Sequence, residues 1–154
     1  MDSNLTLFLD SACGGKQHIP LFYSSKKSRA SEFCNVDGLV LKDGMIKIII
    51  EIEESNVKPT QICGKFLTSA LAKYYIHESR GDKPVEMGGK VFFIQVLDTS
   101  KLVKYKTKKL DQWKKLETAI NNIMPLKNSR ITAYKILTTE ELCELAPLIK
   151  EIAY

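Results

Sequence analysis

The chain has 154 residues, of which 44% are hydrophobic and 27% are charged, a composition that is ordinary for a soluble globular protein. No apolar run approaches the roughly 20 residues that a membrane-spanning helix needs. Residues 1–10 lack the basic start and long apolar stretch of a signal peptide. The sequence therefore predicts a single domain over residues 1–154 that lies in the cytoplasm and has no membrane partner.

The four cysteines are widely scattered, and no two of them form a C-x-x-C pair. Zinc sites and disulfide frameworks show closer or more regular spacing. We therefore predict reduced thiols at all four positions, which are Cys13, Cys34, Cys63 and Cys143.

The net charge of +5 is unevenly distributed along the chain. Residues 1–60 hold 7 basic and 8 acidic side chains, whereas residues 61–154 hold 16 basic and 10 acidic ones. Within residues 101–135, ten lysines or arginines face two acids. This basic half suits a polyanionic partner, although a solvated helix face explains the lysines about equally well.

The first 31 residues give mixed signals. Residues 4–9 fit either a short helix or a strand, and two glycines then end that element. Residues 18–23 are expected to be extended, near an edge because of the proline. The segment Ser24–Ser31 is a polar loop suited to contact with phosphates, and its cations are Lys26, Lys27 and Arg29.

The segment Asn35–Ser55 contains two β runs separated by a turn, and the second run ends in Glu51-Ile52-Glu53. Because strand side chains alternate between faces, Glu51 and Glu53 point the same way. The other face is expected to be apolar and to carry Ile46, Ile48, Ile50 and Ile52. Two acids at the end of so apolar a strand are costly unless a positive group lies beside them.

The turn between the two runs decides whether Asp37 joins these glutamates. A two-residue turn puts Asp37 on the face opposite to Glu51. A three-residue loop that ends at a left-handed Gly44 puts both on one face and also matches apolar residues with apolar residues. We therefore predict the longer loop and a convergence of three carboxylates. Its cross-strand pairs are Leu41 with Met45 and Asp37 with Ile49.

A helix is predicted next, with Ser55 or Asn56 as its capping residue, Pro59 in its first turn and an end near residues 79–81. Its apolar stripe has a spacing near 3.6 and consists of Cys63, Phe66, Leu67, Ala70, Leu71 and Tyr74. The run Lys90–Leu97 is a buried strand. A strand, a helix and a strand in this order indicate a right-handed crossover and a partly parallel sheet.

The rest of the chain continues the alternation of helix and strand. A lysine-rich segment leads into an amphipathic helix with Trp113 in the core, and Arg130–Leu137 alternates as a strand near a sheet edge. Thr138 and Glu141 form a capping-box pattern before a last helix, which Pro147 should kink or split. The predicted fold class is α/β, with a mixed central sheet flanked by helices.

The residues around the acids resemble the PD-(D/E)XK nuclease signature in its restriction-endonuclease-like form. Asp37, a hairpin and the run I-I-E-I-E at residues 49–53 carry this resemblance. It covers roughly residues 18–98, in the element order β, β, β, α, β. Val36 stands where the family often has proline, and Glu53 stands where it usually has lysine.

The resemblance implies a Mg²⁺ ion, or Mn²⁺ in its place, held by Asp37 and Glu51. Glu53 would orient or deprotonate the attacking water or hold a second ion, and Lys65 would supply the missing positive charge. Two carboxylates about 4 Å apart repel by roughly 4 kcal/mol at an effective dielectric near 20, so such a cluster takes up a proton or a cation. The alternative reading is a set of solvated acids at strand ends.

The resemblance also implies a Mg²⁺-dependent DNA endonuclease that hydrolyses phosphodiester bonds, similar to type II restriction enzymes and acting as a homodimer. Its candidate DNA contacts are Lys26, Lys27, Arg29, Lys104, Lys106, Lys108 and Lys109. One alternative is a Holliday-junction resolvase or repair nuclease. Another is a catalytically silent relative that binds DNA or a protein, which the glutamate at position 53 favours.

Overall fold

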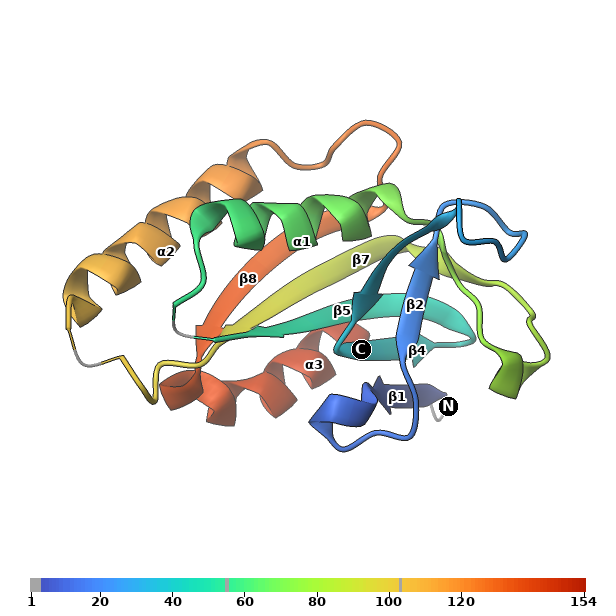
Figure 1. Cartoon of the computed structure of the whole chain (residues 1–154), viewed down its shortest axis with the longest axis horizontal. Coiled ribbons are helices and arrows are strands. Elements are labelled where there is room, and N and C mark those ends of the chain that lie inside the picture. Colours follow the sequence, from blue (N-terminus) through green and yellow to red (C-terminus); the bar gives the residue numbers. More distant parts are fainter. Residues whose placement is uncertain (1–3, 55, 103) are drawn as a thin grey trace.

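The computed structural model describes residues 4–54, 56–102 and 104–154, and these form a mixed sheet flanked by helices (Figure 1). The predicted α/β class is confirmed. The strands are β1 (Leu5–Leu9), β2 (Ile19–Phe22), β3 (Glu32–Val36), β4 (Gly38–Lys42), β5 (Met45–Glu53), β6 (Tyr74–Tyr75), β7 (Val85–Leu97) and β8 (Ile131–Thr138). The helices are α1 (Pro59–Leu71), α2 (Lys106–Asn122) and α3 (Leu145–Ala153), with 3₁₀ turns η1 (Ser11–Cys13), η2 (Glu78–Arg80) and η3 (Thr139–Glu144).

The long strand β7 organises the sheet. The strand order is β1-β4-β5-β7-β6-β2-β3, and β8 also pairs with β7. The pairs β5–β7 and β7–β8 are parallel, whereas β6 pairs with β7 in antiparallel fashion. The predicted strand–helix–strand crossover is therefore present as β5-α1-β7. The expected edge position of the strand at residues 130–137 is also confirmed, since β7 is the only described strand with which β8 pairs.

Helices cover both faces of the sheet (Figure 1). The helices α1 and α2 lie over one face, where Phe66, Phe93 and the predicted core residue Trp113 belong to one buried cluster. Helix α3 lies over the other face, against a second cluster that includes Ile48 and Leu137. None of the described helices is long and apolar enough to cross a membrane.

The hairpin between β4 and β5 has a different register from the one predicted. The turn contains two residues, Asp43 and Gly44, both with positive φ (51° and 79°). The first pairs are Lys42 with Met45 and Leu41 with Ile46, so the three-residue loop and the pair Leu41 with Met45 were wrong. A bulge then shifts the register, and the next pairs are Val40 with Ile48, Leu39 with Ile49 and Gly38 with Ile50.

The bulge has consequences for both faces of β5. An extra residue in one strand reverses which face the following side chains occupy. Ile46 therefore lies in the cluster under α1 and α2, whereas Ile48 and Ile50 lie in the cluster under α3. The predicted apolar face of four isoleucines was wrong at Ile46, and Ile52 at its other end is 44% exposed.

Helix α1 is shorter than predicted. It begins after Lys58, rather than after Ser55 or Asn56, and it ends at Leu71. The chain beyond it is recruited into the sheet, because the Lys73 N–H donates to the Phe22 carbonyl at 2.8 Å and β6 follows. The position of Ser55 itself lies outside the described residues.

The buried stripe of α1 is also rotated relative to the prediction. Its buried residues are Ile62, Phe66, Ser69 and Ala70. Leu67 and Leu71 were expected in the core but are 48% and 51% exposed. In the last helical segment, the Thr138 hydroxyl lies 2.9 Å from the Glu141 carboxylate, and the 3₁₀ turn η3 precedes α3, so Pro147 lies in the first turn of α3. All four cysteines are free, as predicted.

Candidate functional site

The three predicted acids lie near one another where β5 ends. Asp37 is the single residue between β3 and β4, and Glu51 and Glu53 are in the last three residues of β5. The Asp37 N–H donates to the Ile50 carbonyl at 3.1 Å, and Asp37 Oδ2 accepts from the Ile52 N–H at 2.7 Å. The backbone of β5 thus holds the Asp37 carboxylate in place.

The bulge in the hairpin puts Asp37 on the face of Glu51. The last ladder pair is Gly38 with Ile50, and one step further Asp37 lies opposite Glu51. The expected pair of Asp37 with Ile49 was wrong. The register differs from the predicted one by two residues in total, and an even shift leaves the same side chains on the same face.

Lys65 of α1 completes the cluster. Its Nζ atom lies 3.6 Å from Glu51 Oε2 and 3.5 Å from Glu53 Oε1. The Lys65 side chain is 43% exposed, whereas the Glu51 side chain is fully buried and that of Glu53 is 16% exposed. An ammonium from the helix therefore stands beside two carboxylates of the strand, one of which is sealed from solvent.

The Glu51 carboxyl has an unusual environment. Neither of its oxygens has a hydrogen-bond partner among the described residues. Burial, with a further contribution from the neighbouring Asp37 carboxyl, raises the pKa of Glu51 to about 9, although Lys65 opposes this shift. Without a bound cation, Glu51 is therefore protonated at neutral pH.

Glu53 and Lys65 are shifted by the same surroundings. Burial raises the pKa of Glu53 above its ordinary value, against the attraction of Lys65. Burial alone would lower the pKa of Lys65, but the carboxylates of Glu51, Glu53 and Asp37 outweigh it and raise that pKa. Lys65 is thus a stable cation at neutral pH, and the cluster carries both signs of charge.

The cluster fits a divalent cation in one respect and lacks a ready-made cage in another. The two buried oxygens of Glu51 make no hydrogen bond among the described residues and lie next to the fixed carboxylate of Asp37. Mg²⁺ is commonly held by one or two carboxylates and several waters, so Asp37 and Glu51 are a sufficient protein contribution. Within residues 4–54, 56–102 and 104–154, no three acidic, histidine or cysteine side chains are gathered closely enough to enclose an ion by themselves.

Two further groups next to the cluster were not predicted. Asp10 is buried, and its N–H donates to the Asp37 carbonyl at 2.8 Å. Its carboxylate accepts from the Ala12 N–H and lies 2.9 Å from His18 Nδ1. The hydrogen bond to Ala12, the first of several causes, lowers the pKa of Asp10. This Asp10–His18 pair joins residues eight apart through a turn, and no pattern in the sequence indicates it.

Gln95 lies beside Glu51 within the sheet. The register pairs Glu51 with Gln95, so both side chains lie on the face under α1 and α2. Gln95 Oε1 accepts from the buried Tyr134 hydroxyl at 2.7 Å, and its amide nitrogen has no partner among the described residues. A signal was available here, because Gln95 is the one polar residue inside the apolar run from Val91 to Leu97.

The predicted DNA-contacting cations belong to two segments, one around the start of α2 and one in the loop between β2 and β3, and Figure 1 shows these segments at different ends of the sheet. The group at the start of α2 lies at the same end of the sheet as Glu53, since Lys109 Nζ contacts the Val57 carbonyl at 3.4 Å. Lys106 pairs with Glu140, and Lys108 Nζ lies 5.6 Å from the Tyr105 ring centroid. Lys104 is exposed. The group in the loop between β2 and β3 lies at the other end, where Lys27 pairs with Asp82 at 3.2 Å and Lys26 and Arg29 are exposed.

In comparisons with known proteins, no family model, no curated protein and no solved structure matches the chain.

The raised pKa of Glu51 gives a prediction about stability. A carboxyl that binds its proton more tightly in the folded state makes the protein most stable below the unfolded pKa of 4.5. This contribution is lost as the pH rises from 4.5 towards 9, by at most about 1.4 kcal/mol per pH unit. We expect Glu51→Gln to unfold at higher urea concentration than the parent at pH 8 in EDTA, and to show little gain at pH 4.5. Equal pH dependence in both proteins would contradict the burial of an ionisable Glu51.

Proposed function

We propose that the protein is a Mg²⁺-dependent endonuclease of the PD-(D/E)XK type, with a restriction-endonuclease-like core. The single observation that carries the proposal is the cluster of Asp37, Glu51 and Glu53 with Lys65 Nζ at 3.6 and 3.5 Å from the two glutamates. The order β2, β3–β4, β5, α1 and β7 within residues 18–98 supports it, because it follows the order that the resemblance implies once β3 and β4 are counted as one strand and the two-residue strand β6 before β7 is set aside.

Lys65 can replace the lysine that the family usually has at the position of Glu53. The family usually has lysine at the position of Glu53, two residues after the second metal-binding acid. In this chain a lysine ammonium stands 3.5 Å from the Glu53 carboxylate but comes from α1. The positive charge is therefore kept near the reaction while its source in the sequence changes. This placement favours an active enzyme over a silent relative.

The residues have separate tasks in the proposed reaction. Asp37 and Glu51 hold the ion, which when bound lowers the pKa of a coordinated water and offsets charge on the phosphate. Deprotonation of Glu51 accompanies ion binding, since a protonated carboxyl is a poor ligand. Glu53 accepts a hydrogen bond or a proton from the attacking water. Lys65 Nζ donates to an oxygen of the scissile phosphate as negative charge develops there.

DNA is the proposed substrate, and a homodimer in the cytoplasm is the proposed working form. Cutting both strands of a duplex with one site per chain favours two-fold symmetry. The basic start of α2 lies at the same end of the sheet as the acids, which supports the proposal because DNA phosphates need cations near the cut. A Holliday-junction resolvase or repair nuclease ranks second, because the described residues before β2 form the strand β1 and a 3₁₀ turn and not the basic helix that archaeal resolvases have there.

The direct test is incubation of purified protein with supercoiled plasmid in Mg²⁺, in Mn²⁺ and in EDTA. The proposal expects nicking or linearisation with either ion and none in EDTA. Asp43→Asn is a matched control for changes in the cluster, because Asp43 lies in the turn with φ 51°, a conformation that asparagine also tolerates. A parent protein that cuts no DNA with any divalent ion would favour the silent relative.

The basic start of α2 gives a second prediction. Lys104 and Lys108 have no carboxylate partner among the described residues, so changing both to glutamine should weaken duplex binding equally for all sequences. The slope of log K against log salt should become shallower by about 0.9 for each lost phosphate contact. Lys115→Gln is the control, since Lys115 already pairs with Asp111 at 2.8 Å. An unchanged slope would assign these lysines to a solvated helix face.

A further inference from the structure

Two exposed aromatic rings lie at the loop end of the β2–β3 hairpin. Tyr23 directly follows β2 and Phe33 is in β3. Their ring centroids are 5.5 Å apart with an interplanar angle of 25°, so the rings are stacked. Tyr23 is 53% exposed and Phe33 is 39% exposed. The pair therefore offers ring surface that the core of the protein does not use.

One cation lies over this aromatic pair, and two more are in the adjoining loop. Lys73, two residues after α1, places its Nζ atom 5.4 Å from the Tyr23 ring centroid. Lys26 and Arg29 are exposed in the loop that connects β2 and β3. Among the described residues, no carboxylate pairs with Lys73, Lys26 or Arg29. Aromatic rings with unneutralised cations beside them are the chemistry that binds nucleobases and phosphates together.

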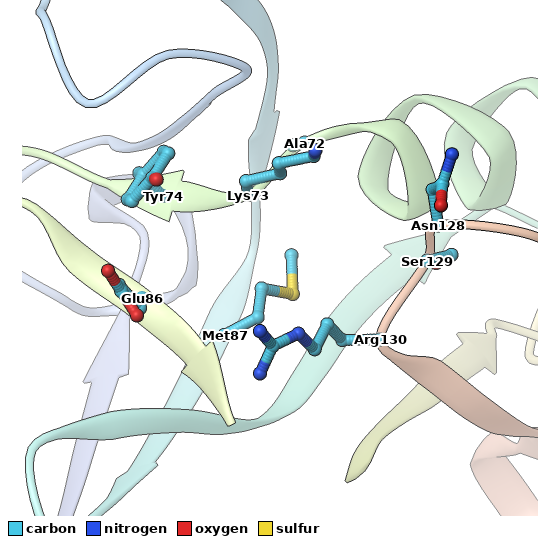
Figure 2. A pocket seen from close by; sticks show the side chains of 8 residues that line it. All are labelled: Ala72, Lys73, Tyr74, Glu86, Met87, Asn128, Ser129 and Arg130. Carbon is cyan, nitrogen blue, oxygen red and sulfur yellow. The ribbon is translucent and has the colours of Figure 1, made fainter. Parts of the chain in front are cut away.

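A cavity of about 440 Å³ adjoins the same lysine (Figure 2). It lies between the end of α1, the start of β7 and the loop before β8. Figure 2 shows the Arg130 guanidinium beside the Met87 side chain, and both residues line this cavity. The lining residues are Ala72, Lys73, Tyr74, Glu86, Met87, Asn128, Ser129 and Arg130.

The polar groups of the cavity match a nucleotide better than a bare anion. Arg130 and Lys73 provide two positive charges for phosphate. Asn128 and Ser129 provide hydrogen-bonding groups for a sugar or a base. Glu86 repels phosphate, but its carboxylate is an acceptor for the exocyclic amino group of a base. A mixed donor and acceptor lining next to a stacking surface distinguishes bases from simple anions.

We propose that Tyr23, Phe33, Lys73 and the adjoining cavity form a binding site for unpaired nucleotides of a nucleic-acid strand. Bases stack on the two rings, and phosphates pair with Lys73 and Arg130. Paired bases are stacked within their own duplex and cannot offer their faces to a ring, so the site selects single-stranded segments.

This inference rests on the proposed function for its link to cleavage and defines the substrate class more narrowly. Phe33 precedes Asp37 by four residues along an extended segment, a distance of about 13 Å. A strand whose scissile phosphate lies at the acid cluster thus reaches the ring pair within a few nucleotides. An unpaired stretch close to the cut, as in a flap, a gap or a frayed end, should therefore make a duplex a better substrate than fully paired DNA.

The test measures binding in EDTA, so it does not depend on cleavage. Fluorescence anisotropy is recorded with a labelled 12-nucleotide oligo-dT and with a duplex of equal length. The parent is expected to bind the single strand more tightly than the duplex. The double variant Tyr23→Ala/Phe33→Ala should lose about tenfold or more of its affinity for oligo-dT, because stacking contributes strongly for each base. Its affinity for the duplex should change little.

Matched variants separate stacking from general damage. Tyr154→Ala removes another exposed tyrosine with a lysine over its ring, since Lys42 Nζ lies 5.9 Å from the Tyr154 centroid, and should bind as the parent does. Tyr23→Phe/Phe33→Tyr keeps both rings and should keep the affinity, which also controls for folding. Lys73→Gln should make the salt slope for oligo-dT shallower by about 0.7.

The inference is overturned if the alanine pair and the parent bind oligo-dT equally, or if Tyr154→Ala loses as much affinity as the alanine pair. It is also overturned if the parent binds no single strand at all. A parent that cuts plasmid but shows no ring-dependent binding would leave the nuclease proposal standing without this site. If the parent never cleaves DNA but binds oligo-dT through the two rings, the binding site would stand and the nuclease proposal would fall.

Discussion

Replacing Asp37 by asparagine is expected to abolish Mg²⁺-dependent DNA cleavage while leaving the fold intact. Asp37 Oδ2 accepts from the Ile52 N–H at 2.7 Å, and the side-chain oxygen of asparagine can accept the same bond. What the variant loses is a negative ligand beside Glu51. Removing one of two carboxylates from a Mg²⁺ site should lower both the affinity for the ion and the rate of hydrolysis.

Ion binding by the same variant can be followed without DNA. Mg²⁺ stabilises any protein that binds it only in the folded state, so millimolar Mg²⁺ should raise the Tm of the parent and not that of Asp37→Asn. Binding of duplex DNA in EDTA should be equal or tighter in the variant, because a carboxylate no longer faces phosphate. Asp43→Asn should match the parent in all three measurements. Cleavage that survives in Asp37→Asn would remove Asp37 from the site.

The position of the acids was predictable because it depends on parity rather than on register. Alternation along β5 places Glu51 and Glu53 on one face, and any even shift of the partner strand brings Asp37 to that face. We rejected the two-residue turn because, without a bulge, it puts Asp37 on the face opposite to Glu51. A bulge at Lys47 adds the second residue, and nothing in the run I-K-I-I-I at residues 46–50 indicates that Ile46 and Ile48 lie on opposite faces of the sheet.

Features that depend on distant partners were not predictable in the same way. We predicted the apolar stripe of α1 for a helix that continues to residue 79. In the structure the chain after Leu71 pairs with Leu21 and Phe22 of β2 and joins the sheet. That competition is decided by tertiary pairing and not by helix propensity. The placement of Lys65 near the acids was expected from the strand–helix order, whereas its position between two carboxylates needed the packing of α1 on β5.

Replacing Lys65 by methionine is the second change with a large expected effect. Methionine keeps the length and apolar stem of the side chain and removes the ammonium from 3.6 and 3.5 Å of the two glutamates. If Lys65 stabilises charge on the phosphate, cleavage should fall by about 10²–10³-fold, the range for loss of one such donor. The helix lysine Lys150, on the opposite face of the sheet, gives the control Lys150→Met, which should cleave as the parent does.

Loss of activity in Lys65→Met alone does not separate a role in catalysis from relief of repulsion between the acids. The exchange variant Glu53→Lys/Lys65→Glu does, because the Nζ and Oε1 atoms of the parent are 3.5 Å apart and the exchange returns lysine to the strand position that the family uses. Partial recovery of cleavage relative to Lys65→Met would show that the reaction needs one ammonium at this point and tolerates either origin. Glu53→Lys alone leaves two ammonium groups beside Asp37 and Glu51, where they compete with the metal ion. It should therefore bind Mg²⁺ more weakly than the exchange variant. An exchange variant that binds Mg²⁺ normally, yet cleaves no better than Lys65→Met, would mean that the acid at position 53 is itself required, as a base or as a ligand for a second ion.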